Sequence, residues 1–498
     1  MRGLERMSPH SIDPRTPVLV GVAQLKQKPD NPLDALEPLA LMTEVVAAAA
    51  ADAGAPALTN RLDSIRVVKG AWPYKDPARL IAERLGAKPR QTATTHDGGN
   101  TPQSLVNLSC LDIVAGRYDA IAIVGAEAIW SRRRAHRAKQ VIPYTTDDGP
   151  SAIALLHDLE MSSEVEVARG FAAPVNIYPL FESAFRASRG ESIPDHIARI
   201  SKLWEGFNEV AVANPYAWSR QAMTATQIAT ATEDNRLVGF PYTKAMNSNW
   251  DLDQAAALIL CSAESASALG VPKDRWVFVW AGTDAHDTGQ IAHRHSFHES
   301  PAIRLAGRRL WDLAAIGPDA VAHCDLYSCF PSAVQISATE LGLGLDRQLT
   351  QTGGLTFAGG PLNNYVTHAI AAMAGTLREH AGDVGLCTAN GGYLTKHALG
   401  LYSTTPPPVL FRHADVQAEV DREPTRVFDA DYQGVATIES YTVMHGHEGP
   451  ENALLTALTP GGQRALASST DVDMMQALMK AEHVGRVTNI GPDARASI

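Results

Sequence analysis

The stretch GGLTFAGGPLNNYVTHAIAAMAGTLREHAGDVGLCTANGG, residues 353–392, decides the fold of this chain. A Gly-rich turn precedes an apolar helix of small residues, which we expect from about Tyr365 to Leu377. Residues 383–388 then predict a buried strand that brings Cys387 close to a second Gly-rich turn, Gly391-Gly392. Glycine permits sharp turns, and a helix N-terminus offers unpaired N–H groups. The stretch is therefore typical of a corner that an anionic ligand or a developing oxyanion approaches.

An earlier stretch, HDGGNTPQSLVNLSCLDIVAGRYDAIAIVGAEA at residues 96–128, repeats this order. A double-Gly turn is followed by a helix of small residues at about 103–115, a loop with an Asp, and a buried strand at 120–124. Two similar units predict two α/β halves packed about a pseudo-twofold axis. We expect the two Gly-rich turns to face each other.

The composition describes an ordinary soluble globular protein. The 498 residues exceed what one compact core usually organises, so we expect two or three domains or a duplicated core. A net charge of −11 gives no indication of a nucleic-acid-binding face. The five cysteines form no C-x-x-C pattern, and no metal site is expected. Neither a secretion signal nor a membrane-length apolar run is evident, which predicts a cytoplasmic location.

Two further segments surround these units. Residues 128–250 are irregular, with a helix expected at about 195–210, and predict an inserted lid or substrate-binding subdomain. Beyond the Pro-rich linker STTPPP at 403–408, alternating segments and a Gly-Gly turn at 461–462 predict a small OB-like β-barrel. This barrel lacks the excess of basic residues that nucleic-acid binding needs.

These units resemble the thiolase superfamily over about residues 15–402. The resemblance is greatest to sterol-carrier-type thiolases and to thiolase-like proteins of type 1, which carry an extra C-terminal domain. It implies an α/β thiolase fold with five αβαβα layers, built from two βαβαβαββ halves. The implied domains are an N-terminal half at 15–127, an inserted CoA-binding lid at 128–250, a C-terminal half at 251–402 and an additional domain at 409–498. The implied ligand is coenzyme A or an acyl-CoA, with no tightly bound cofactor.

The loops that carry chemistry in thiolases differ here. Gly99 stands at the position of the nucleophilic Cys, and Gly360 replaces the His of the G-H-P loop. The N-E-A-F or H-D-C-F loop reads Tyr327-Ser328-Cys329-Phe330, so Tyr327 replaces the residue that holds the catalytic water or oxyanion. Cys387 matches the Cys of the C-x-G loop. Asn249, Gly359 and Gly360 are the candidate CoA-binding residues that the resemblance implies.

Ordinary thiolase activity needs a thiolate made by Cys and His together with an oxyanion hole, and the loss of both side chains removes the acyl-enzyme route. The first hypothesis is therefore an acyl-CoA-binding member of the acetyl-CoA acetyltransferase family in lipid or acyl-CoA metabolism. It acts alone or with a partner protein, as a monomer or an oligomer.

The second hypothesis is a non-standard acyl-CoA enzyme that uses Cys387, assisted by Tyr327, His368 or His397. Backbone N–H groups near the Gly-rich turn would lower the pKa of Cys387 toward the thiolate. The alternative for Cys387 is an inert, packed thiol, and His323 and His368 are expected to be structural. A third hypothesis is a scaffold role.

Overall fold

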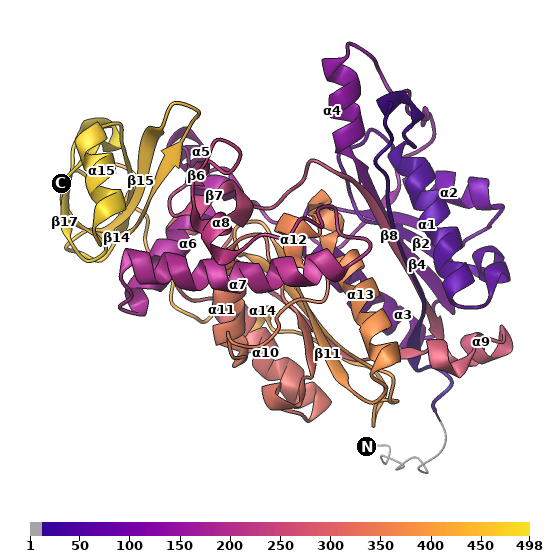
Figure 1. Ribbon diagram of the computed structural model, residues 1–498. Coiled ribbons are helices and arrows are strands. Elements are labelled where there is room, and N and C mark those ends of the chain that lie inside the picture. Colours follow the sequence, from indigo (N-terminus) through magenta and orange to yellow (C-terminus); the bar gives the residue numbers. More distant parts are fainter. Residues whose placement is uncertain (1–11) are drawn as a thin grey trace.

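A computed structural model describes residues 12–498 of the protein, and one large mixed sheet runs through it (Figure 1). Its strands follow the spatial order β10-β11-β12-β9-β1-β8-β4-β2-β3-β5, with β13 beside β9. Their bounds are β1 (Pro17–Lys26), β2 (Ser64–Val67), β3 (Gln91–Thr95), β4 (Ala120–Ala128), β5 (Ile153–Leu155), β8 (Asp253–Ser262), β9 (Val277–His286), β10 (His323–Asp325), β11 (Val384–Gly391), β12 (Lys396–Ser403) and β13 (Arg412–Asp415).

The sheet consists of two sections that meet where β1 pairs with β9, through Val18 with Phe278 and Leu19 with Val277. The first section includes β8, which pairs antiparallel with both β1 and β4. Every residue of β8 is buried, as befits a strand in the middle of a sheet covered on both faces. The predicted domain boundary at residue 251 assigns β8 to the second half, whereas its partners β1 and β4 belong to the first. The reason is that the inserted residues lie between β4 and β8 in the sequence, although the two strands are neighbours in space.

The helices form three layers around the two sections. The central layer is α3 (Thr101–Val114) and α13 (Tyr365–Glu379), which contact strands of both sections; in Figure 1 α13 lies between β11 and β8. On the outer faces, α1 (Pro38–Asp52) and α2 (Pro77–Leu85) cover the first section and α10 (Pro301–Ala314) covers the second. Both central helices are buried on nearly all sides, because a sheet lies on each side of them. The predicted five-layer thiolase fold is confirmed.

The inserted residues are mainly helical. They include α4 (Ile129–Arg137), α5 (Glu164–Ala168), α6 (Pro174–Ser188), α7 (Ile193–Ala213), α8 (Ala225–Ala229), β6 (Leu237–Gly239) and β7 (Tyr242–Thr243). The helix expected at 195–210 is confirmed as α7. Shorter helices elsewhere are α9 (Ala263–Ala268) and α12 (Gly354–Phe357).

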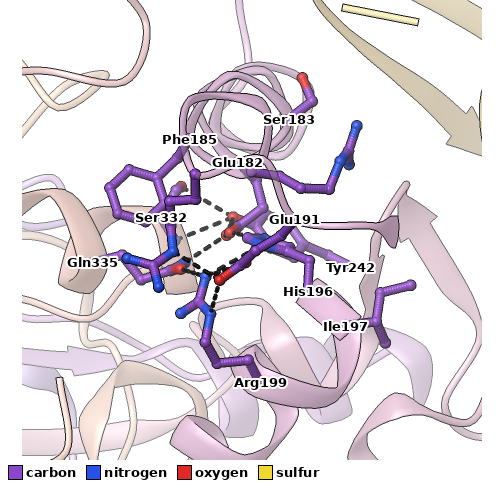
Figure 2. A network of polar contacts seen from close by, with 12 residues as sticks. Glu182, Ser183, Phe185, Glu191, His196, Ile197, Arg199, Tyr242, Ser332 and Gln335 are labelled. Atoms are coloured by element: carbon purple, nitrogen blue, oxygen red, sulfur yellow. Dashed lines mark hydrogen bonds and ion pairs between the residues drawn. The ribbon is translucent and has the colours of Figure 1, made fainter. Parts of the chain in front are cut away.

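A buried polar network fixes the insertion to the second half (Figure 2). The imidazole of His196 in α7 lies between two carboxylates, 2.5 Å from Oε1 of Glu182 and 2.7 Å from Oε2 of Glu191. Gln335 of α11 (Pro331–Leu341) donates to the same Glu182 oxygen at 2.7 Å. Because a buried carboxylate is costly without partners, this network favours one docking geometry for α6 and α7.

The C-terminal residues form a second sheet in the order β16-β15-β14-β17-β18. Its elements, with the helix beside them, are β14 (Gly434–His445), β15 (Pro450–Leu458), β16 (Arg464–Ser469), α15 (Val472–Lys480), β17 (Val487–Ile490) and β18 (Ala496–Ser497). The short helix α14 (Gln417–Val420) precedes them and packs on β9 and α10 of the large sheet. The predicted Gly-Gly turn joins β15 to β16. Through Gly239 of β6, which pairs with Met444 of β14, the insertion joins this sheet, so the additional domain is docked on the insertion. A bridge between Ser468 and Arg495 curls the sheet toward closure.

Within residues 12–498, no helix has both the length and the apolar character that crossing a membrane requires.

Candidate functional site

The Gly-rich turns of the two halves meet at a cavity of about 410 Å³, here called the corner cavity. Its lining residues are Asp97, Gly98, Gly99, Met161, Pro174, Val175, Tyr178, Asn247, Ser248, Trp250, Tyr327, Cys329, Phe330, Leu355, Gly360, Leu362, Asn363, Asn390, Gly391, Gly392 and Lys396. The backbone N–H of Gly98 donates to Oδ1 of Asn363 at 3.0 Å, which ties the first turn to the second. The predicted facing of the two turns is confirmed.

At Gly99, the predicted nucleophile position, a tyrosine fills the space that a side chain would need. A Cβ added to Gly99 would lie 2.3 Å from the hydroxyl oxygen of Tyr327 and 2.5 Å from the carbonyl oxygen of Asn390. Burial raises the pKa of Tyr327 well above its ordinary value, so its hydroxyl is protonated. The corner therefore presents a neutral phenol beside Gly99, where the resemblance predicts the nucleophile position of thiolases.

At the predicted base position, the two neighbouring glycines differ in how strictly the structure requires glycine. Gly359 has a φ of 113°, and a Cβ there would lie 2.4 Å from Oε1 of Gln254, so this residue has to be glycine. Gly360 is less restricted, since its Cβ would meet Leu355 at 3.1 Å. Its backbone N–H donates to the carbonyl oxygen of Asn249 at 2.8 Å. The three predicted CoA-binding residues are thus adjacent in space.

Cys387 lies away from the corner cavity. It is in the interior of β11, pairs with Gly400 and Asp325, and is fully buried. Burial raises the pKa of its thiol well above the ordinary value, opposite to the direction predicted from the nearby turn. Alternation along the strand explains its position: Asn390, three residues further on, points into the cavity, so Cys387 points to the other face.

Cys329 is the cysteine that lines the cavity, and the sequence analysis named it only as part of the loop from Tyr327 to Phe330. Its Sγ lies 3.9 Å from Nδ2 of Asn390, its exposed fraction is 7%, and burial raises its pKa to about 12. One feature of the sequence could have identified Cys329 as a cavity residue: it lies two residues after Tyr327, and both side chains line the same corner. Both groups are protonated and act as hydrogen-bond donors rather than nucleophiles.

Polar groups at the rear of the cavity are held in place by Tyr178. Its hydroxyl accepts hydrogen bonds from Nδ2 of Asn390 and from the backbone N–H of Leu394, each at 2.9 Å. Oδ1 of Asn390 is buried and has no partner within the described residues, so it is a free acceptor. On the opposite side, Lys396 donates to the carbonyl oxygen of Asp97 at 2.6 Å, and burial lowers its pKa. A few fixed polar groups in an apolar cavity are characteristic of a ligand site.

A second cavity of about 880 Å³, here called the outer cavity, shares Val175, Asn247, Ser248 and Trp250 with the corner cavity. Its other lining residues include Trp130, Arg133, Trp218, Lys244 and Asn249. The rings of Trp130 and Trp218 meet edge to face with centroids 5.5 Å apart, and the guanidinium of Arg133 lies 5.3 Å from the ring of Trp250. Indole rings beside cationic groups suit a planar base and phosphates.

The two histidines proposed as assistants lie elsewhere. His368 is buried in α13, where Nδ1 contacts Oε1 of Gln24 at 2.9 Å and burial lowers the pKa to about 3. His397 is buried in β12, with Nε2 3.7 Å from Oδ2 of Asp287. Neither is among the residues that line the corner cavity.

The layers, the paired Gly-rich turns and the cavity between them define a protein of the thiolase fold. Residues 415–495 match the family model described as the thiolase-like protein type 1 additional C-terminal domain. The monomeric SCP2-thiolase-like protein type 1 from Mycobacterium smegmatis is 30% identical, with a TM-score of 0.83, over 98% of this chain and 100% of that one. The chain therefore belongs to the SCP2-thiolase-like proteins of type 1, and the predicted resemblance is confirmed.

More distant relatives share parts of this architecture. An acetyl-CoA acetyltransferase from Methanocaldococcus jannaschii is 24% identical over 266 residues, which are 53% of this chain and 60% of that protein. The chain thus spans about three fifths of that curated relative. The structure of an Ltp2-ChsH2(DUF35) aldolase, 18% identical with a TM-score of 0.58, covers 78% of this chain and 98% of its own and has the same fold.

Proposed function

We propose that this protein binds coenzyme A or an acyl-CoA in the joined corner and outer cavities and lacks ordinary thiolase activity. The observation that carries the proposal is the hydroxyl of Tyr327 in the space of the missing nucleophile at Gly99. Its role would be in lipid or acyl-CoA metabolism.

Two side chains that ordinary thiolase chemistry needs are missing. Acyl transfer through a covalent intermediate needs a thiolate and a base within hydrogen-bond reach. Gly99 offers no nucleophile and Gly360 offers no base. Because such groups act as a unit, losing both costs several powers of ten in rate.

Each cavity would hold a different part of the CoA ligand. The pantetheine arm would pass Asn249 and enter the corner cavity, with its thioester beside Tyr327, Cys329 and the free acceptor of Asn390. The nucleotide end would remain in the outer cavity, among indole rings and the cationic groups of Arg133 and Lys244.

A second candidate is a non-standard acyl-CoA enzyme. It is favoured by the position of Tyr327 and Cys329, two protonated donors that line one cavity and could polarise a carbonyl oxygen. Cys387, the predicted nucleophile, has no access to that cavity, so Cys329 is the better-placed thiol. A partner protein that completes such a site stays a proposal; a neighbouring thiolase-fold structure is named as a complex with a DUF35 protein.

Binding calorimetry with CoA and several acyl-CoAs, run beside a 3-ketoacyl-CoA thiolysis assay, tests the proposal. We expect binding without detectable thiolysis. Trp250→Ala should weaken CoA binding by about 5- to 150-fold, the value of one base–aromatic stack. Arg309→Ala, at an exposed ion pair with Glu419, is the matched control and should leave affinity unchanged. No binding at millimolar CoA, or thiolysis on the order of 10 per second, would overturn the proposal.

A further inference from the structure

Three potential metal ligands converge at the end of the second half that lies opposite the corner cavity. His323 begins β10, His380 directly follows α13, and Asp383 directly precedes β11. Their donor atoms all lie within 4.8 Å of one another. Nε2 of His323 is 2.9 Å from Oδ2 of Asp383, and the two imidazole rings have centroids 5.2 Å apart.

The fold itself brings these residues together. β10 and β11 are parallel neighbours, and His323 pairs with Gly385. The turn from α13 into β11 is short, with the backbone N–H of Asp383 donating to the carbonyl oxygen of His380 at 3.2 Å. The end of α13 therefore returns to the start of β10. A helix C-terminus also carries partial negative charge, which favours a cation at this place.

We propose that His323, His380 and Asp383 bind Zn²⁺ or a similar divalent transition-metal ion. Two imidazoles and one carboxylate are ligands that Zn²⁺ accepts, whereas Mg²⁺ and Ca²⁺ prefer all-oxygen sites. Zinc bonds of about 2.0–2.2 Å place tetrahedral donors about 3.4 Å apart. The side chains close to that separation by small rotations, since His380 is exposed and the other two are half-buried. The ion replaces the direct contact between His323 and Asp383, and solvent takes the fourth position.

A metal ion at this site would stabilise the strands and the helix that carry residues of the corner cavity, without contacting the cavity. The same elements carry cavity residues at their other ends: Tyr327 follows β10, Asn390 is the last but one residue of β11, and Asn363 precedes α13. From His323 to Tyr327 the chain extends about 13 Å. A bound ion would cross-link β10, β11 and α13 where they start or end, and so stabilise the fold. Metal binding at this site does not depend on any ligand in the corner cavity.

The test uses the full chain without an affinity tag, first stripped of metal by a chelator. Calorimetric titration with Zn²⁺ should show one ion per chain, and Zn²⁺ should raise the Tm because it binds the folded state. His323→Ala and His380→Ala should each weaken Zn²⁺ affinity at least about 100-fold, more than the loss of an outer-sphere contact costs. Mg²⁺ at the same concentration should give no heat and no change in Tm.

The matched control is His298→Ala, because His298 also stands beside a carboxylate, 3.6 Å from Glu299, but has no third ligand among residues 12–498. This variant should bind Zn²⁺ like the parent chain. His380 is exposed, so His380→Ala should keep the parent's Tm without metal, which separates loss of a ligand from loss of the fold. Failure of the parent chain to bind Zn²⁺ below millimolar concentration, or equal affinity in the parent and both His variants, would overturn the proposal.

Discussion

Replacing Gly99 by Ala should destabilise the protein, although alanine is the smallest possible addition. The new Cβ would lie 2.3 Å from the hydroxyl oxygen of Tyr327, 2.8 Å from its Cζ and 2.5 Å from the carbonyl oxygen of Asn390. All three distances are shorter than real Cβ contacts. The carbonyl belongs to β11, which is paired along its length with β12, so the tyrosine ring has to move. Overpacking of this kind costs about 1–3 kcal/mol.

A double-mutant cycle identifies the contact. Tyr327→Phe removes the hydroxyl and the shortest contact, so Gly99→Ala should cost less in that background, with a coupling free energy of about 0.5–3 kcal/mol. The assay is equilibrium unfolding in urea. Gly206→Ala in α7 is the matched control. Outside the helix's own backbone, no atom of the described residues lies within 4 Å of its added Cβ, and the variant should be more stable by about 1 kcal/mol. A Gly99→Ala variant as stable as the parent, with no coupling to Tyr327→Phe, would refute the conclusion that Tyr327 occupies the space beside Gly99.

Further predictions concern thiols and carboxylates. The thiols of Cys329 and Cys387 both have a raised pKa, so both should react slowly with iodoacetamide at pH 7. Mass spectrometry should find Cys329 modified first and protected by CoA, because it lines the cavity. Earlier modification of Cys387 would contradict the cavity assignment. Burial raises the pKa of Glu127, whose exposed fraction is 2%, to about 7. Between about pH 4 and 7 this carboxyl then binds more protons in the folded state than in the unfolded state, so its contribution to the free energy of unfolding should fall as pH rises, by on the order of 3 kcal/mol. Glu127→Gln, which keeps an acceptor for the N–H of Ala71, should remove that contribution, so the difference in free energy of unfolding between variant and parent should grow from pH 4 to pH 7; a difference that stays constant in a urea-unfolding series would count against the prediction. Burial opposes ionisation of Glu191, but hydrogen bonds from Arg199, Arg189 and His196 outweigh it and lower its pKa to about 2 (Figure 2). Its contribution is therefore present above about pH 4 and lost toward pH 2. Glu191→Gln should lower the Tm at pH 7 and leave it unchanged near pH 2, and an equal loss at both would show that ionisation is not the cause.

Much of the fold follows from local patterns. The helix expected from Tyr365 and the strand before Gly391 are both present, because continuous burial produces apolar runs that are visible in sequence. The place of β8 does not follow from such patterns. Its residues predict a strand, but pairing with β1 and β4 across the insertion depends on contacts between residues far apart in the chain.

The candidate site shows the same division. The resemblance located Gly99, Tyr327 and Gly360, and all three line the corner cavity. It also selected Cys387 over Cys329, because a motif records an order of residues and not the face of the strand on which each lies. In a β-strand a shift of one residue exchanges the buried face for the cavity face, so a loop whose register is loosely matched gives no reliable orientation.

By itself the sequence determined that the chain has two α/β units with Gly-rich turns and that a β-rich domain follows, and it predicted glycines in place of a Cys and a His at two thiolase positions. Only the tertiary structure decided that the hydroxyl of Tyr327 takes the space beside Gly99 and that Cys329 is the thiol in the cavity. It alone brought His323 to His380 and Asp383. The physical reason is that composition and periodicity report burial, which is a property of each residue, whereas a site is a set of distances between residues that only packing fixes.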